Sequence, residues 1–317
     1  MASAERTKPS TTAPLLIDGG TGTELRRRGA PLDPIAWSGL AALTHSEILT
    51  AIHADYLAAG ADVITTNTFA CTRFVLDAKG FGSERQRIVR ASVEAARAAR
   101  DRCGRDALIA GALSCFPPGF DVRRYPKPDD ERAAYLELAA GLADAGVDLI
   151  VLEMMEDTEH ARRACDAVRE IGLPFWLGVS VRRARDGRLV AYDFPETPFE
   201  AVLDALLGFR PEVVNVMHSP PRDVKAALRA LGARFGGAIG AYPETGEPLP
   251  DGRPGESLDA ESFAALAATW LDEGVAVLGG CCGTTPAHIR ALRALLDRRI
   301  SGGTLPPAPA DRPPRRP

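Results

Sequence analysis

The 317-residue sequence lacks the features that mark several protein classes. No apolar run approaches the ~20 residues of a membrane-spanning helix, and residues 1–13 lack the apolar centre of a secretory signal. The formal net charge is only −4, which gives no general attraction for nucleic acid or anionic membranes. Six cysteines are too sparse for a disulfide scaffold in a chain of this length. We therefore predict a cytoplasmic protein with reduced thiols that binds neither nucleic acid nor membranes.

Both ends of the chain are poor in apolar periodicity. Residues 1–12 are rich in Ser, Thr and Lys, and residues 301–317 are rich in Pro and Arg. Such segments cannot bury enough apolar surface to offset the entropy lost on ordering. We predict flexible tails at 1–12 and 301–317 around a single domain at 13–300. The hydrophobic content of 45% is sufficient for a large core in that domain.

Between the tails, short apolar runs alternate with stretches of helical periodicity, and this alternation predicts a parallel sheet covered by helices. The predicted strands are 15–18, 62–67, 107–113, 147–153, 174–180, 213–218, 234–242 and 275–280. The predicted helices are 44–60, 83–102, 131–146, 157–172, 198–208, 221–232, 258–274 and 286–299. Thr44 and Asp157 are expected N-caps, and Pro286 an expected first helical residue.

Eight such units predict an α/β fold, a single-domain (β/α)8 TIM barrel. An open doubly wound sheet is the alternative, but the G-x-G-x-x-G turn typical of many such sheets is absent after the first strand. Active sites of barrels lie where strands end and βα loops begin. That rule selects the following polar residues: Asp18, Glu24, Thr66, Asn67, Ser114, Cys115, Glu153, Ser180, Asn215, His218, Tyr242, Cys281 and Cys282.

Two adjacent thiols, Cys281 and Cys282, stand in the Gly-rich stretch 278-LGGCCGTTPAHIR-290. A lone cysteine is usually a small buried hydrophobe, but two neighbouring thiolates can bind one soft divalent ion. A tetrahedral zinc site needs at least one more protein ligand, and His218 at the end of the sixth strand offers it. Three protein ligands leave one position open, at which zinc would hold a substrate thiol as a thiolate.

The chain resembles the homocysteine S-methyltransferase family, zinc-dependent barrel enzymes that methylate the sulfur of homocysteine. The matching segments are 17-IDGGTGTEL-25, 64-ITTNTF-69, 151-VLEMMED-157, 242-YPETGE-247 and 277-VLGGCCGTTPAHI-289. The resemblance implies that Cys281 and Cys282 are zinc ligands and that acidic side chains contact the amino acid part of the acceptor. The expected catalytic residues are Asp18, Glu24, Thr66 and Glu153. The expected substrate-binding residues are these four with Asn67, Asn215 and Tyr242.

One segment, 215-NVMHSPP-221, departs from the family pattern. The family has Asn-Cys at the end of the sixth strand, and that cysteine is its third zinc ligand, whereas Val216 stands in its place here. We expect His218 to replace it, because period-two alternation puts residues 216 and 218 on the same side of a strand. Cys115 as the third ligand, or the loss of zinc, are the alternatives.

The family's short members imply a small onium donor, namely S-methylmethionine, S-adenosylmethionine or betaine, since a single barrel has no room for folate- or cobalamin-binding modules. The cation would meet aromatic rings such as Trp37, Phe69, Phe116 or Tyr242. The expected acceptor is homocysteine or a related thiol or selenol, which would place the protein in methionine biosynthesis.

Two further expectations concern a loop and other functions. Residues 115–130 form a long insertion that would serve as a lid or as the contact of a homo-oligomer.

The enzymatic alternative is a zinc-dependent protein with Lewis-acid or hydrolytic chemistry. The non-enzymatic alternative is a metal-free binding or regulatory protein in which Cys281 and Cys282 form a redox-sensitive pair.

Overall fold

The structure of the protein, a computed structural model, describes residue 7 and residues 13–115, 125–246 and 257–302. Most of the two predicted tails and the centre of the predicted lid lie outside these residues. Within the first tail, Thr7 is buried, and its carbonyl accepts a hydrogen bond of 3.2 Å from the indole of Trp176. Among the described residues, no helix has the length and apolar character needed to cross a bilayer.

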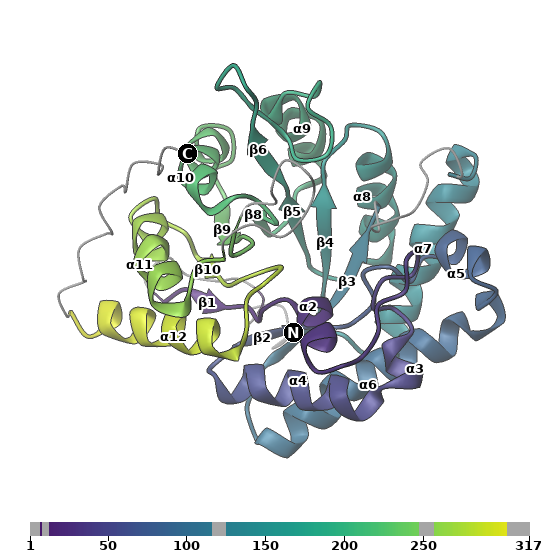
Figure 1. Ribbon diagram of the computed structural model, residues 1–317. Coiled ribbons are helices and arrows are strands. Elements are labelled where there is room, and N and C mark those ends of the chain that lie inside the picture. The colour runs from purple at the N-terminus through teal and green to yellow at the C-terminus, as the bar shows by residue number, and fades with distance from the viewer. Residues whose placement is uncertain (1–6, 8–12, 116–124, 247–256, 303–317) are drawn as a thin grey trace, which may run out of the picture.

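Eight parallel strands form a closed ring in the order β1-β10-β9-β8-β5-β4-β3-β2 (Figure 1). The ring closes between its first and second strands, where Ile17 bridges Val63 and the Asp18 N–H donates to the Val63 carbonyl. The strands are β1 (Leu15–Leu16), β2 (Val63–Thr65), β3 (Leu108–Ser114), β4 (Leu149–Met155), β5 (Phe175–Val179), β8 (Val213–Met217), β9 (Ala238–Tyr242) and β10 (Val277–Leu278). Each lies within a predicted strand or overlaps it, and the (β/α)8 barrel is confirmed.

Helices surround this ring, as Figure 1 shows. Those that overlap the eight predictions are α4 (Ser46–Ala58), α6 (Arg85–Cys103), α7 (Pro128–Ala145), α8 (His160–Ile171), α9 (Phe199–Leu206), α10 (Pro221–Gly232), α11 (Ala260–Leu271) and α12 (Pro286–Ile300). Shorter additions in the loops are α2 (Thr21–Arg27), α3 (Ala41–Thr44), α5 (Arg73–Ala78), and the 3-10 turns η1 (Gly82–Glu84) and η3 (Leu207–Phe209).

Helix ends follow the expected chemistry at several positions, but neither predicted N-cap occupies the cap position of its helix. Gly146 and Gly172 end α7 and α8 in the left-handed conformation, and Pro286 opens α12. The Asp157 carboxylate accepts hydrogen bonds from the N–H groups of Glu159, His160 and Ala161, as a capping side chain does, but the cap position of α8 is Glu159, so the predicted N-cap lies two residues too early. The prediction that Thr44 caps α4 is wrong, because Thr44 is the last residue of the preceding α3 and His45 takes the cap position.

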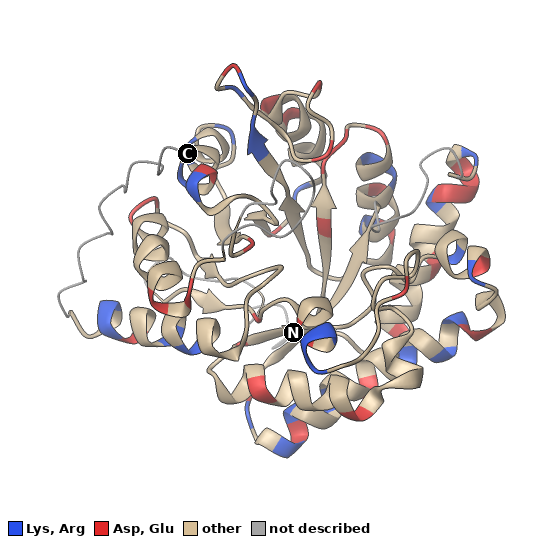
Figure 2. Cartoon of the chain, viewed as in Figure 1, with Lys and Arg blue, Asp and Glu red and all other residues tan. Residues whose placement is uncertain are grey.

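Side chains alternate between two apolar layers along each strand. On β8, Val213 and Met217 face the barrel interior, whereas Val214 and Val216 pack in the larger layer between strands and helices. Charged residues gather on the outer helices, and the central strands carry few of them (Figure 2). Glu153 is the one acidic residue of β4, whose other side chains are apolar. A carboxyl group in such a strand is costly to bury and therefore sets this part of the barrel apart.

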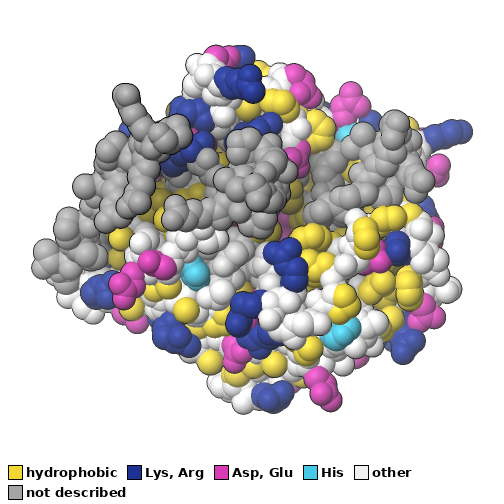
Figure 3. Space-filling model, viewed as in Figure 1, with side chains coloured by type: hydrophobic (Ala, Val, Ile, Leu, Met, Phe, Trp, Pro, Cys, Tyr) yellow, Lys and Arg dark blue, Asp and Glu magenta, His cyan; other side chains and the backbone are white. Residues whose placement is uncertain are grey.

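An antiparallel hairpin, β6 (Val181–Arg183) and β7 (Leu189–Ala191), follows β5 and stands outside the barrel. The sequence analysis did not predict it, since each of its strands has only three residues. The outer surface elsewhere is mixed: hydrophobic atoms are scattered among polar and charged ones on the face in Figure 3. Among the described residues, Ile300 is the one exposed large hydrophobic side chain.

Candidate active site

A cavity of about 330 Å³ opens at the carboxyl ends of the strands. Its position is that of active sites in other barrels, because the βα loops meet there. Predicted site residues that line it are Asp18, Thr66, Asn67, Glu153, His218, Tyr242, Cys281 and Cys282. Of the aromatic side chains suggested for the donor cation, Trp37, Phe69 and Tyr242 also line it, whereas Phe116 lies outside the described residues.

The loop that carries the two thiols is fixed by bonds to its neighbours. The Cys281 N–H donates to the Pro243 carbonyl at 2.8 Å, and the Cys282 carbonyl accepts from Thr245 at 3.0 Å. Thr284 donates through its hydroxyl to the Cys281 carbonyl and accepts from the Gly20 N–H. The loops after β1, β9 and β10 are therefore tied together, and the thiols are held in place without contributing to those bonds.

A glycine is required for this close packing at position 280. A Cβ placed on Gly280 would lie 2.3 Å from the Thr284 side chain, far inside van der Waals contact. A Cβ on Gly279 would lie 2.3 Å from the Ile17 side chain, so the Gly-Gly pair is explained by close packing against β1's end on one side and Thr284 on the other. The small residues seen in the sequence serve the geometry of the thiol loop.

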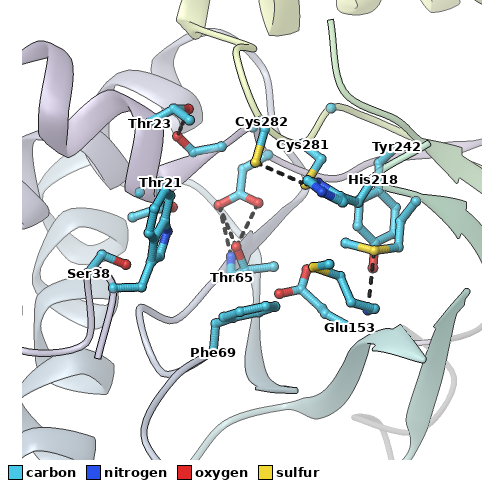
Figure 4. Close-up of a pocket in the computed structure, with 18 of the residues that line it drawn as sticks. Thr21, Thr23, Ser38, Thr65, Phe69, Glu153, His218, Tyr242, Cys281 and Cys282 are labelled. Carbon is cyan, nitrogen blue, oxygen red and sulfur yellow. Dashed lines mark hydrogen bonds between the residues drawn. The ribbon is translucent and has the colours of Figure 1, made fainter. Parts of the chain in front are cut away.

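His218 leaves β8 with a positive φ of 43°. Few non-glycine residues adopt this conformation, and it often accompanies functional sites. The turn reverses the side chain, which points into the cavity toward both thiols (Figure 4). The alternation argument for His218 is wrong, because Val216 faces the helices and an uninterrupted strand would have sent His218 the same way.

The donor atoms of His218, Cys281 and Cys282 all lie within 4.8 Å of one another. The Cys281 sulfur is 3.6 Å from the His218 Nδ1 and 4.0 Å from the Cys282 sulfur. Tetrahedral zinc, with bonds of about 2.3 Å to sulfur and about 2.0 Å to nitrogen, would separate sulfur from nitrogen by about 3.5 Å and sulfur from sulfur by about 3.8 Å. The donor set and its spacing fit a soft divalent metal. It is the one such group of three among the described residues, and it excludes Cys115, which is buried against Met155.

Electrostatics favour the metal-binding form of one thiol. A hydrogen bond from Cys281 and the charge of His218 hold the pKa of Cys282 well below its usual range, despite burial. Burial lowers the pKa of His218, but the charge of Cys282 outweighs it and raises that pKa to about 10. These shifts favour the Cys282 thiolate, the ligand form of cysteine, beside a protonated His218 imidazole that would release its proton on binding a metal.

Glu153 projects into the cavity from a distorted part of β4. The register with β5 shifts between Leu152 and Met155, and Met154 has a φ of 55°. The Met154 N–H donates a hydrogen bond to the Met217 sulfur at 3.3 Å instead of to a neighbouring strand. Burial, with the charge of Cys282, raises the pKa of Glu153 to about 7. A cation bound beside Glu153 would therefore favour its negatively charged carboxylate form.

Asp18 lies across the cavity and is already hydrogen-bonded. Its carboxylate accepts from the Thr65 N–H at 2.9 Å and from the Thr65 hydroxyl at 3.0 Å (Figure 4). Burial nevertheless raises the pKa of Asp18 well above its usual range, against these bonds. Thr65 was missed by the sequence analysis, although its period-two relation to inward-facing Val63 was a usable signal.

Two predicted substrate-binding residues do not line the cavity. The Glu24 side chain is buried on α2 with both oxygens bonded, to the guanidinium groups of Arg27 and Arg28. Asn215 is buried in the barrel interior beside Gly240. The helical turn after β1 directs Glu24 to its own helix, and strand alternation places Asn215 one layer below Met217. The structure therefore does not bring either side chain to the cavity wall, and their contact with an acceptor stays a prediction.

Other cavity residues came from the unpredicted hairpin. Tyr192 and Asp193 directly follow β7 and line the wall beside His218. The two rings of Tyr192 and His218 lie 5.0 Å apart, centre to centre, at 53°. No motif in the sequence marked Tyr192, because its position depends on how the hairpin folds back over the barrel.

The chain is similar in sequence to known methyltransferases over most of its length. The chain matches the sequence model of the homocysteine S-methyltransferase family over residues 15–296. It is 29% identical to homocysteine S-methyltransferase 2 of Arabidopsis thaliana, covering 90% of this chain and 93% of the relative. It is 28% identical to a selenocysteine Se-methyltransferase of Brassica oleracea var. italica, over 90% and 89% of the two chains.

A solved structure is similar over nearly the whole barrel. The homocysteine methyltransferase MmuM of Escherichia coli, in its metallated form, matches with a TM-score of 0.72 and 25% identity over 89% of this chain and 96% of that chain. The family match spans the rim segments that carry Asp18, Glu153 and the two adjacent thiols. The chain therefore belongs to the homocysteine S-methyltransferase family, a family of methyltransferases.

Proposed function

We propose that this protein transfers a methyl group from a small onium donor to a thiol or selenol, with homocysteine as the principal acceptor. The observation that carries the proposal is the group formed by Cys281, Cys282 and His218, whose donor atoms lie within 4.8 Å on the wall of a cavity that also presents Glu153. The names of the relatives, which include homocysteine and selenocysteine methyltransferases, support this class of acceptor.

We infer that zinc is the metal held by Cys281, Cys282 and His218. A bound zinc ion would supply one open position and keep the acceptor sulfur or selenium anionic at neutral pH. Two thiolates and a neutral imidazole balance the charge of the ion, whereas three thiolates would leave an excess negative charge. We therefore expect a less electron-rich acceptor here than in a three-cysteine site.

Acidic groups on two sides of the cavity would bind the amino acid part of the acceptor. Glu153 has a pKa near 7, and an incoming ammonium group would lower it and favour the carboxylate. Asp18 is oriented by Thr65 before any substrate arrives. The chain then acts by orientation, because it fixes the acceptor between these acids and the thiol loop.

The donor cation would lie against aromatic faces. Trp37, Phe69, Tyr192 and Tyr242 line the same cavity, and ring faces attract onium groups. The acceptor sulfur forms the new bond to the methyl carbon as the donor's bond to that carbon breaks. The donor heteroatom retains the electron pair and leaves neutral, so no proton is moved in this step.

The test combines metal analysis with turnover. Freshly reduced protein should contain about one zinc ion per chain, and His218→Ala and Cys281→Ser should lose it. Cys165→Ser, which changes a buried cysteine on α8 that does not line the cavity, is the matched control and should retain the metal. Homocysteine incubated separately with S-methylmethionine, S-adenosylmethionine and betaine then identifies the donor by the methionine formed.

Two results would refute the proposal. Reduced wild-type protein without zinc, and without zinc-dependent turnover, would favour a metal-free binding or regulatory role. Turnover of a donor without any thiol or selenol acceptor would favour hydrolytic chemistry instead. Selenocysteine, offered as a second acceptor, ranks the two chalcogens by their kcat/KM.

A further inference from the structure

The imidazole of His218 needs support from outside its own strand. The residue leaves β8 in a left-handed conformation, and its N–H makes a long hydrogen bond of 3.4 Å to the Tyr242 carbonyl. A thiol loop with several short bonds is fixed by itself, whereas a single side chain on a strained turn is not. A ligand that departs from its strand therefore requires a neighbour that restricts its ring.

Tyr192 is that neighbour. Its ring lies 5.0 Å from the His218 ring at a tilt of 53°, an arrangement in the favourable range for aromatic pairs. The far end of Tyr192 is anchored as well, since its hydroxyl donates to the Glu244 carboxylate at 3.2 Å. Tyr192 thus spans from the imidazole to the loop after β9.

The backbone on either side of Tyr192 is fixed to the barrel. The Tyr192 N–H donates to the Ser180 carbonyl at 3.3 Å. The next N–H, of Asp193, donates to the Glu156 carboxylate at 2.7 Å, and Glu156 is fully buried just after β4. The tyrosine ring therefore has little freedom to move away from His218.

The hairpin that carries Tyr192 is also bonded to the segment that carries His218. The Val181 N–H donates to the Ser219 hydroxyl at 2.9 Å, and Ser219 is the residue after His218. Arg183 contacts the buried carboxylate of Asp223, on α10, through its backbone N–H and its guanidinium, each at 3.0 Å. The first strand of the hairpin is therefore hydrogen-bonded at both of its ends to the segment that follows His218.

We propose that the β6–β7 hairpin is a brace for the histidine ligand and that Tyr192 is a positioning residue, which holds the imidazole with Nδ1 toward the two thiols. This inference rests on the metal centre in the proposed function. It assigns to Tyr192 a role in retaining the metal, beyond packing the hairpin against the barrel. The phenyl ring provides the brace, and the hydroxyl refines its position.

The first experiment compares Tyr192→Phe with Tyr192→Leu. Zinc release to an excess of a chromogenic chelator should be at least tenfold faster in Tyr192→Leu than in wild type and within about threefold of wild type in Tyr192→Phe. The visible spectrum of the Co²⁺-substituted protein should change in Tyr192→Leu and be restored in Tyr192→Phe. Wild-type release rates and spectra in Tyr192→Leu, or a change confined to the donor KM, would overturn the proposal.

A second pair of variants tests the hairpin without altering the cavity. Arg183→Ala removes the guanidinium contact to Asp223 but keeps the backbone bond, and it should hasten zinc release to an intermediate degree. Arg182→Ala is the matched control on the same strand, because Arg182 is exposed and forms no ion pair among the described residues. Equal release rates in the two arginine variants would contradict the brace.

A metal-independent measurement separates this inference from the proposed function. The chain has five histidines, so the His218 imidazole resonance can be assigned by its loss in His218→Ala. In metal-free, reduced protein, one sharp resonance is expected in wild type and Tyr192→Phe, and a broadened or divided one in Tyr192→Leu. If wild type bound no metal, the proposed function would fail, yet this comparison would still support or overturn the brace.

Discussion

The two sides of the cavity differ in how far their polar groups are already satisfied. On the side of β1 and β2, Asp18 is bonded to Thr65, and the side chain of Asn67 is bonded to Ser38 at both of its amide atoms. On the side of β4, β9 and β10, the buried Tyr242 hydroxyl interacts with the Glu153 carboxyl alone, without a hydrogen bond of normal geometry among the described residues. We call the first side closed, because its acid and its amide are hydrogen-bonded within the protein, although the buried Thr21 hydroxyl there has no partner among the described residues. We call the second side open, because the Glu153 carboxyl, whose pKa burial raises to about 7, lines the cavity there.

This difference has an energetic meaning. Buried polar groups without partners are costly, so a protein that keeps them near a cavity gains that energy back when a ligand arrives. Groups that are satisfied internally give orientation but little new binding energy. Changes on the open side, at Glu153 above all, should therefore affect activity more than changes on the closed side.

The largest expected effect is that of Glu153→Gln. The substitution removes the charge opposite the acceptor's ammonium group, and kcat/KM with homocysteine should fall roughly 100-fold, in line with the loss of a charged hydrogen bond. Zinc content should be unchanged. Glu170→Gln, at an exposed ion pair with Arg132, is the control and should match wild type. A loss below threefold at Glu153 would remove it from the site.

Next is the pH dependence introduced by Glu156, which lies behind the open side with its Oε1 unpartnered among the described residues. Burial and the neighbouring Asp193 raise its pKa to about 8. Because the folded-state pKa exceeds the unfolded one, its stabilising contribution is full in acid and is lost as pH rises toward 8. The stability of wild type relative to Glu156→Gln should fall by about 2 kcal/mol between about pH 6 and 7.5, measured by urea unfolding. A constant difference would contradict this.

A smaller effect is expected from Asp18→Asn on the closed side. The pKa of Asp18 is raised by burial, so ionisation of this carboxyl destabilises the fold as pH increases. The amide removes that cost while its oxygen still accepts from Thr65. Urea unfolding at about pH 8 should show stability equal to or above wild type, whereas the homocysteine KM should rise about tenfold with the lost charge. Lower stability with an unchanged KM would mean that Asp18 is only structural.

The smallest effect on activity is expected from Glu24→Gln. Its carboxylate bonds to Arg27 and Arg28 and lies away from the cavity. The variant should lose only about 1 kcal/mol of stability, because the Arg27 side chain of the pair with Glu24 is exposed and solvent weakens that pair. The KM and kcat should stay within about threefold of wild type. A tenfold rise in KM would return Glu24 to the substrate-binding set and would weaken the distinction between the two sides.

Local patterns were sufficient for the elements of the barrel. Apolar runs of strand length and amphipathic helical stretches are set by residues close in sequence, so eight units could be counted without tertiary information. The missed hairpin illustrates the limit, because strands of three residues carry too few side chains for a periodic signal. The failed Thr44 cap has a related cause, since a short extra helix, α3, ends where the cap was expected.

The site shows the same division at the level of single residues. Adjacent cysteines in a glycine-rich loop are a local pattern, and the sequence identified Cys281 and Cys282 by it. His218 was selected by chemistry but for the wrong geometric reason, since a positive φ breaks the alternation on which the argument depended. Glu24 shows the converse: the motif was present, but the arginines one turn away occupy its carboxylate.

The sequence by itself determined the barrel, the rim on which its chemistry lies and two of the three candidate metal ligands, because each of these depends on short-range periodicity or on neighbouring residues. Only the tertiary structure decided which side chains share the cavity. It turned His218 inward, left Asn215 below the cavity, and brought Tyr192 from a hairpin beyond the barrel to the imidazole. Those outcomes depend on backbone turns and on contacts between segments distant in the chain, and no local pattern encodes them.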